Sequence, residues 1–168
     1  MTTNYHRTKE WFELSLNNLN RVIRNYEFKD YADCVFRIQL TIEQLQKSLV
    51  FLLGLQFRKT HFVSKILENI DDYENLNLNE KVSKQIKEIA ELSKILEEEH
   101  TKTRYGIIED NKLITPEDTY NKEKTIEFLI ILIKIIDKVV TLLEPLPELE
   151  NLNSELKKNV QKIKDFIK

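Results

Sequence analysis

Residues that break helices are scarce in this chain, which has 2 Gly and 3 Pro among its 168 residues. Hydrophobic residues make up 41% of the chain and charged residues 32%. Because Gly and Pro disfavour helix interiors more than any other residues, this composition predicts an all-α protein. The length suits one domain with a single substantial core.

Cysteine and net charge are also low. The single cysteine, Cys34, cannot form an internal disulfide, which favours a cytoplasmic protein. The N-terminal segment MTTNYHRTKEW lacks the apolar core of a signal peptide, which favours the same location. With a formal net charge of −2, the surface as a whole does not attract nucleic acid, so RNA binding would need a local basic patch.

Long uninterrupted hydrophobic runs are missing as well. The most apolar stretch, residues 125–143, contains Glu127, Lys134, Asp137 and Lys138. Each of these charges would cost about 2.5–3.5 kcal/mol at the centre of a bilayer. The stretch therefore predicts a deeply buried helix of a bundle, and no membrane partner is expected.

Apolar residues at helical spacing predict six helices. The first four are expected at residues 8–26, 29–53, 61–70 and 80–101; the fifth begins after Pro116 or at Asn121, and the sixth covers 148–167. The first helix is expected to bury Trp11, Leu14, Leu19, Val22, Ile23 and Tyr26. Apolar residues of the second helix alternate in steps of four and three, which is typical of a helix packed lengthwise on a partner. Gly54 is predicted to end it, and residues 106–120 are predicted to form the longest loop.

The expected architecture is an up-and-down bundle of four to five core helices plus an extra C-terminal helix. Residues 1–145 are expected to form the bundle. Residues 146–168 are expected to add an amphipathic helix that packs on the same domain.

Three segments carry a family resemblance: FRIQLTIEQLQKSLVFLLG (36–54), RKTHFVSKIL (58–67) and EEHTKTRYG (98–106). In this order they resemble the HEPN domain (higher eukaryotes and prokaryotes nucleotide-binding) in its stand-alone archaeal and bacterial form. The residues that match the family pattern are Gln39, Glu43, Lys47, Gly54, Thr60, His61, Arg104 and Tyr105. Gly106 stands where the family often has proline. The resemblance covers about residues 8–143, and the C-terminal helix lies beyond it.

The resemblance implies a helical bundle, often dimeric, that binds a nucleotide or RNA. It also implies a protein partner, because family members often pair with a minimal nucleotidyltransferase in toxin–antitoxin systems. Many members are metal-independent ribonucleases with an Arg followed four to six residues later by a His. That motif is absent here, since no His follows Arg104, and only two residues separate Arg58 from His61. His100 precedes Arg104 by four residues, in the reverse order, so enzymatic activity stays open.

Positive and aromatic residues gather where the helix at 80–101 is expected to end. The candidates for binding a nucleotide or phosphate are Arg104, Tyr105, Lys102, His61 and Lys47. Arginine can hold two phosphate oxygens and tyrosine can stack on a base. The candidates for a catalytic role are His61, His100 and Arg104. Basic residues in a last helical turn are also favoured by the helix dipole alone, so a charged helix end without a ligand stays open.

Two further interpretations concern the polar residues. Glu43 and Lys47 are predicted to form an intrahelical ion pair. No cofactor or metal site is expected, because the sequence has no Gly-rich phosphate loop and no metal-ligand spacing, although His61 and His100 with residues 97–99 could in principle hold a metal.

Three functions remain as hypotheses. The first is a nucleotide- or RNA-binding and interaction module, a homodimer that works with a nucleotidyltransferase. The second is a metal-independent ribonuclease with a non-standard Arg/His site. The third is a helical scaffold without a ligand.

Overall fold

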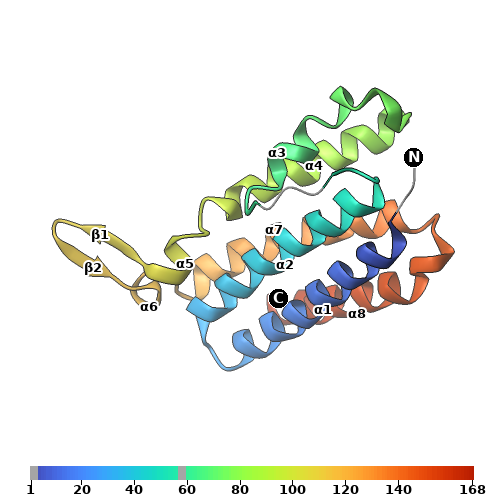
Figure 1. The fold of residues 1–168 in the computed structure, drawn as a ribbon. Helices are drawn as coiled ribbons and strands as arrows, with labels where there is room; N and C mark the ends of the chain where they lie inside the picture. The colour runs from blue at the N-terminus through green and yellow to red at the C-terminus, as the bar shows by residue number, and fades with distance from the viewer. Residues whose placement is uncertain (1–3, 57–59) are drawn as a thin grey trace.

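Five long helices form a bundle in the computed structural model of this chain, which describes residues 4–56 and 60–168. They are α1 (Tyr5–Glu27), α2 (Tyr31–Leu52), α4 (Glu80–Glu97), α7 (Lys122–Leu143) and α8 (Glu150–Phe166). Figure 1 shows α2 and α7 in the centre, with α1 and α8 on one side and α4 on the other. The predicted all-α bundle with an extra C-terminal helix is confirmed.

Short elements connect the long helices. Between α2 and α4 lie α3 (Ser64–Glu68) and two 3₁₀ turns, η1 (Ile70–Asp72) and η2 (Glu74–Leu76). Between α4 and α7 lie α5 (Lys102–Tyr105), the strands β1 (Ile107–Glu109) and β2 (Lys112–Ile114), and α6 (Pro116–Thr119). A third 3₁₀ turn, η3 (Pro147–Leu149), precedes α8. None of the described helices has both the length and the hydropathy that a membrane crossing needs.

The ends of the central helices follow from local sequence. Gly54 has a φ of 66° just after α2, a conformation that glycine adopts without strain. Its N–H donates to the carbonyl of Phe51, and the N–H of Leu55 donates to that of Val50, both at 3.0 Å. This is the Schellman arrangement that closes many helices, so the predicted role of Gly54 is confirmed. Asn121 caps α7 by accepting a backbone N–H three residues on, at 2.9 Å.

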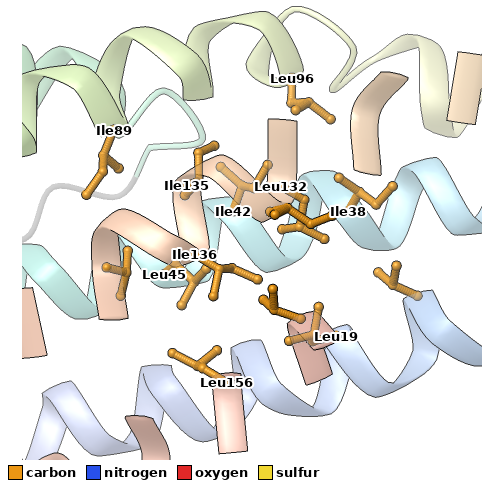
Figure 2. Close-up of a cluster of buried hydrophobic side chains, with 14 of the residues drawn as sticks. Leu19, Ile38, Ile42, Leu45, Ile89, Leu96, Leu132, Ile135, Ile136 and Leu156 are labelled. Carbon is orange, nitrogen blue, oxygen red and sulfur yellow. The ribbon is translucent and has the colours of Figure 1, made fainter. Parts of the chain in front are cut away.

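The hydrophobic core lies around α2 and α7 (Figure 2). It brings together Leu19 of α1, Ile38, Ile42 and Leu45 of α2, Ile89 and Leu96 of α4, Leu132, Ile135 and Ile136 of α7, and Leu156 of α8. Each of these side chains is almost completely buried, and burying a side chain of this size stabilises the fold by about 1.5–3 kcal/mol. Because α2 contributes to the core along its whole length, it is a rigid support for the polar residues described below.

The face of α1 that enters the core differs from the predicted one. Leu19 is buried as expected, but Leu14 is 44% exposed and Trp11 is only half-buried. Phe12 and Leu16 are buried instead. Phe12, Leu16 and Leu19 follow one another in steps of four and three, which is the spacing of a seam along a neighbouring helix. Trp11 lies one position away from this seam, which turns its ring about 100° around the helix.

The prediction of a long loop at 106–120 was wrong. β1 and β2 form an antiparallel hairpin in which Ile107 lies opposite Ile114. Its turn consists of Asp110 and Asn111, whose φ angles of 49° and 62° fit the tight turns that match the twist of a hairpin. Figure 1 shows the hairpin projecting from the end of the bundle near α5 and α6.

The hairpin begins at a backbone geometry that depends on glycine. Gly106 has φ 68° and ψ −162°, and a Cβ atom there would lie 2.1 Å from the carbonyl oxygen of Ile114. We expect Gly106→Ala to lower the free energy of unfolding by about 3 kcal/mol, measured by urea denaturation followed by circular dichroism. In Gly54→Ala the main effect is that alanine must adopt a left-handed backbone conformation, so this variant should lower the free energy of unfolding by only about 1 kcal/mol. Equal stability of Gly106→Ala and the wild type would contradict this geometry.

Candidate functional site

A row of polar side chains lies on the buried side of α2. Gln39, Glu43, Gln46 and Lys47 are each no more than 6% exposed. Burying such groups is costly unless they form hydrogen bonds, and burying a charge is costlier still. Their partners therefore define what this part of the bundle can do.

Glu43 is the centre of the larger polar cluster. Its Oε1 accepts a hydrogen bond from Lys47 Nζ at 2.6 Å, and its Oε2 accepts one from Gln39 Nε2 at 3.1 Å. Nδ1 of His61 lies 3.2 Å from both carboxylate oxygens. Lys47 Nζ also lies 4.7 Å from the centre of the Trp11 ring, as in a cation–π contact. The predicted Glu43–Lys47 pair is confirmed, and it extends to His61.

These contacts fix the charge of Glu43 and the orientation of His61. Burial raises the pKa of Glu43, but the hydrogen bonds and positive charges of Lys47 and His61 outweigh it, so the pKa lies below its ordinary value. The carboxylate is therefore ionised at neutral pH and accepts the Nδ1–H of His61. This leaves Nε2 as the ring nitrogen of the half-exposed His61 that is not bonded to Glu43.

His61 lies against a second histidine. The ring centres of His61 and His100 are 4.3 Å apart. His100 belongs to the turn after α4, and Arg104 follows in α5 with its guanidinium carbon 5.4 Å from the centre of the Phe36 ring of α2. Burial lowers the pKa of His100, and the positive charges of Arg104 and His61 lower it further against the opposing effect of Glu43. His100 is therefore neutral at neutral pH.

Two nitrogens of this cluster are buried but lack a hydrogen-bond partner among residues 4–56 and 60–168. They are Nε2 of His100 and Nε of Arg104. An unpaired buried polar group costs about 1–3 kcal/mol, so such groups gather where a protein receives a ligand or water. The charges of Lys47 and Arg104 also exceed that of Glu43, which makes the cluster locally positive in a chain with a net charge of −2.

A second polar cluster attaches α3 to α4. Oε1 of Glu97 accepts hydrogen bonds from the backbone N–H of Ser64 at 2.9 Å and from Gln46 Nε2 at 3.2 Å. Its Oε2 accepts one from the Ser64 hydroxyl. Because Ser64 lies only three residues after His61, this attachment helps to fix the position of the histidine. The only signal for it in the sequence was the row of acidic residues at 97–99.

Three of the predicted phosphate-binding residues lie in the Glu43 cluster: Lys47, His61 and Arg104. His100, a predicted catalytic residue, lies beside them. Thr60 does not cap α3, which begins at Ser64; its hydroxyl accepts the N–H of Phe62 at 3.0 Å. Arg58 lies outside the described residues.

Lys102 and Tyr105 lie differently from the other candidates. Nζ of Lys102 donates to Oε1 of Glu99 at 3.1 Å, while Oε2 of Glu99 accepts from the Tyr120 hydroxyl at 2.5 Å. Tyr105 is 70% exposed at the base of the hairpin. Within the described part of the chain, no three His, Cys, Asp or Glu side chains are grouped so that they could hold a metal ion.

The geometry defines an all-α bundle that holds two neighbouring histidines, a guanidinium and a buried carboxylate where α2, α4 and α5 meet. Comparison with known families names the class: the family model of the HEPN domain matches residues 8–146. The match covers most of the chain, so the chain belongs to the HEPN domain family, as the three segments predicted. Membership supports a nucleotide- or RNA-related module in general terms. No curated protein and no solved structure matches this chain.

The Glu43 cluster predicts a large effect of removing its negative charge. Glu43→Gln leaves the ammonium group of Lys47 buried without its carboxylate, and breaking such a pair costs about 3 kcal/mol. We expect the free energy of unfolding at pH 7, measured by urea denaturation, to fall by about that amount. Glu68→Gln is the control, because the Glu68–Lys94 pair is exposed and is worth less than about 1 kcal/mol.

The same variant has a defined pH dependence. The folded state holds Glu43 at a lowered pKa, so the wild type gains stability above the ordinary glutamate pKa of about 4.3 and loses it as the pH falls through the lowered value. The difference between wild type and Glu43→Gln should therefore be largest near neutral pH and should shrink in acid. A difference that stays constant down to pH 3 would contradict an ionised Glu43.

Proposed function

We propose that this protein is a binding module of the HEPN type whose site at His61, His100 and Arg104 holds a phosphate group of a nucleotide or RNA. The observation that carries the proposal is the pair of buried nitrogens, Nε2 of His100 and Nε of Arg104, that have no partner among the described residues. Phosphate oxygens would accept from the guanidinium and could bond to the imidazole.

Charge supports this choice of ligand. Lys47 and Arg104 place two positive charges against the single carboxylate of Glu43 in a chain that is slightly acidic overall, so an anion is attracted to this cluster. Lys47 contributes its charge while it bonds to Glu43. Tyr105 follows Arg104 directly and is exposed, so it is available to stack on a base at the edge of the site. Lys102 contributes a further positive charge, partly balanced by Glu99.

The proposal extends to the assembly that the family implies. A homodimer that works with a minimal nucleotidyltransferase in a toxin–antitoxin system is consistent with membership in the HEPN family. Co-expression with the product of a neighbouring nucleotidyltransferase gene, followed by affinity purification of the complex, tests the protein partner separately from the ligand.

Arg104 is the residue whose loss should weaken phosphate binding most, because a guanidinium can hold two oxygens at once. We expect Arg104→Ala to weaken binding of a nucleotide or a short RNA by about 1.5–3 kcal/mol, measured by titration calorimetry. Arg21→Ala is the matched control, because Arg21 is exposed on α1 and outside the cluster. If wild type and both variants bind every ligand of the panel equally weakly, the cluster is not a phosphate site.

A second candidate function is RNA cleavage without a metal. It is favoured by the contact between two histidines of different character: His61 is oriented by Glu43, and His100 is held neutral. A neutral imidazole can take the proton of a ribose 2′-hydroxyl while a protonated one gives a proton to the leaving 5′-oxygen. Arg104 would then stabilise the negative charge of the phosphate in the transition state.

Substitution of His61 separates the two functions. If the protein cleaves RNA, His61→Ala should lower the cleavage rate at least about a hundredfold and change RNA affinity much less. Cleavage of a labelled RNA is followed on a gel, and His6→Ala is the control, because His6 is exposed near the start of α1. Wild-type protein that binds RNA without cleaving it would exclude the nuclease and retain the binding module.

A further inference from the structure

Phe62 is a large aromatic side chain that lies at the surface beside the two histidines of the site. It is 47% exposed, whereas the next residue, Val63, is completely buried. The centre of the Phe62 ring lies 6.4 Å from that of His100, and His100 in turn contacts the ring of His61. Among the exposed aromatic side chains of the described chain, only Phe62 has a ring contact with this histidine pair.

The segment that carries Phe62 is fixed on both sides. Before it, the N–H of Phe62 donates to the Thr60 hydroxyl at 3.0 Å, and His61 is bonded to a buried carboxylate of α2. After it, Ser64 donates to Glu97 through its backbone N–H and its hydroxyl. Single exposed apolar side chains are common on protein surfaces. A ring that the fold holds next to a candidate site is different, because it presents a preformed flat surface to a ligand.

A nucleobase is a ligand group that fits this surface. Every base has a flat π face, so stacking on an aromatic side chain is a general way to bind nucleotides and single-stranded RNA. Phe62 and the half-exposed His61 are open to solvent, whereas the unpartnered nitrogens of His100 and Arg104 are buried. A ligand that enters the site would place its anionic end inward and its flat end on Phe62. A nucleotide carries both ends, joined by one sugar.

Lys65 marks the face of the Phe62 ring that such a base would cover. Nζ of Lys65 lies 5.6 Å from the centre of the ring, as in a cation–π contact. The Lys65 side chain is exposed, and contacts of this kind are weak at exposed sites. A base that stacks on Phe62 would take the place of the ammonium group, which the flexible stem of lysine allows.

We propose that Phe62 forms a nucleobase subsite, on which the base of a nucleotide or an RNA residue stacks while its phosphate lies at His100 and Arg104. The inference rests on the proposed phosphate site and adds the requirement that the phosphate be joined to a base. Sugar phosphates without a base therefore bind more weakly than nucleotides. Because stacking does not read the edges of a base, the subsite accepts different bases and favours those that stack most strongly.

A matched pair of ligands tests the subsite by titration calorimetry. Adenosine 5′-monophosphate and ribose 5-phosphate share the sugar and the phosphate and differ in the base. We expect the wild type to bind the nucleotide at least about fivefold more tightly. Phe62→Leu should remove this preference, because leucine is apolar but has no flat ring, and Phe62→Trp should keep it. Phe28→Leu is the control, because Phe28 is 78% exposed at the end of α1.

An RNA pair extends the same comparison. A short oligoadenylate and its counterpart with abasic ribose residues have the same phosphates, so the preference for the first should also depend on Phe62. Unchanged circular dichroism of Phe62→Leu and Phe28→Leu verifies that both variants are folded.

Fluorescence gives an independent readout of stacking. A base that stacks on an indole ring quenches its emission, so adenosine 5′-monophosphate should quench Phe62→Trp more strongly than Phe28→Trp. Ribose 5-phosphate should not distinguish these two variants. Both contain Trp11, so the comparison between them removes its contribution.

The outcomes separate this inference from the phosphate site on which it rests. Loss of the base preference in Phe62→Leu, together with quenching in Phe62→Trp, supports the subsite. Equal affinity of the wild type for both members of each pair, with weaker binding of both by Arg104→Ala, overturns the subsite and retains the phosphate site. A base preference that Phe62→Leu leaves unchanged also overturns it, and its loss in Tyr105→Leu would assign the base to Tyr105. If no probe binds, both proposals are overturned.

Discussion

A carboxylate inside a helical bundle has to be held by donors, and the site of this protein depends on how Glu43 meets that requirement. Leaving an ion unpaired in the interior costs several kcal/mol. Gln39 and Lys47, one turn before and one turn after Glu43, supply part of what it needs from the same helix. His61 supplies the rest from the segment after α2. The same interaction that makes the buried charge tolerable therefore places the histidine and selects its tautomer.

The electrostatics of the site are local and differ from those of the whole chain. The chain is slightly acidic, yet its clustered cations lie where α2 and α5 approach each other. Arg104 rests on the Phe36 ring, which leaves the guanidinium edge available for hydrogen bonds. The positive charge is thus concentrated in one cluster and is not spread over a broadly basic surface.

The sequence predicted what depends on neighbouring residues and missed what depends on distant ones. The seam of α2, the closing Gly54 and the start of α7 at Asn121 are local signals, and all appear in the structure. The adjacent aromatics Trp11 and Phe12 left the rotation of α1 ambiguous by one position. The hairpin was missed because strands of three residues are too short to show alternation. The contacts Glu43–His61 and Ser64–Glu97 join residues 18 and 33 positions apart, which periodicity cannot reveal.

The attachment of α3 to α4 has a consequence for how this protein can vary. Glu97 accepts from Ser64 through both the backbone N–H and the hydroxyl, and the backbone donor is present with every residue except proline. Substitution of Ser64 would therefore remove only the hydrogen bond from its hydroxyl, whereas substitution of Glu97 would remove both hydrogen bonds. Positions 64 and 97 are partners in one interaction, yet position 64 tolerates substitution better than position 97. The position of the segment that contains His61 therefore depends mainly on Glu97.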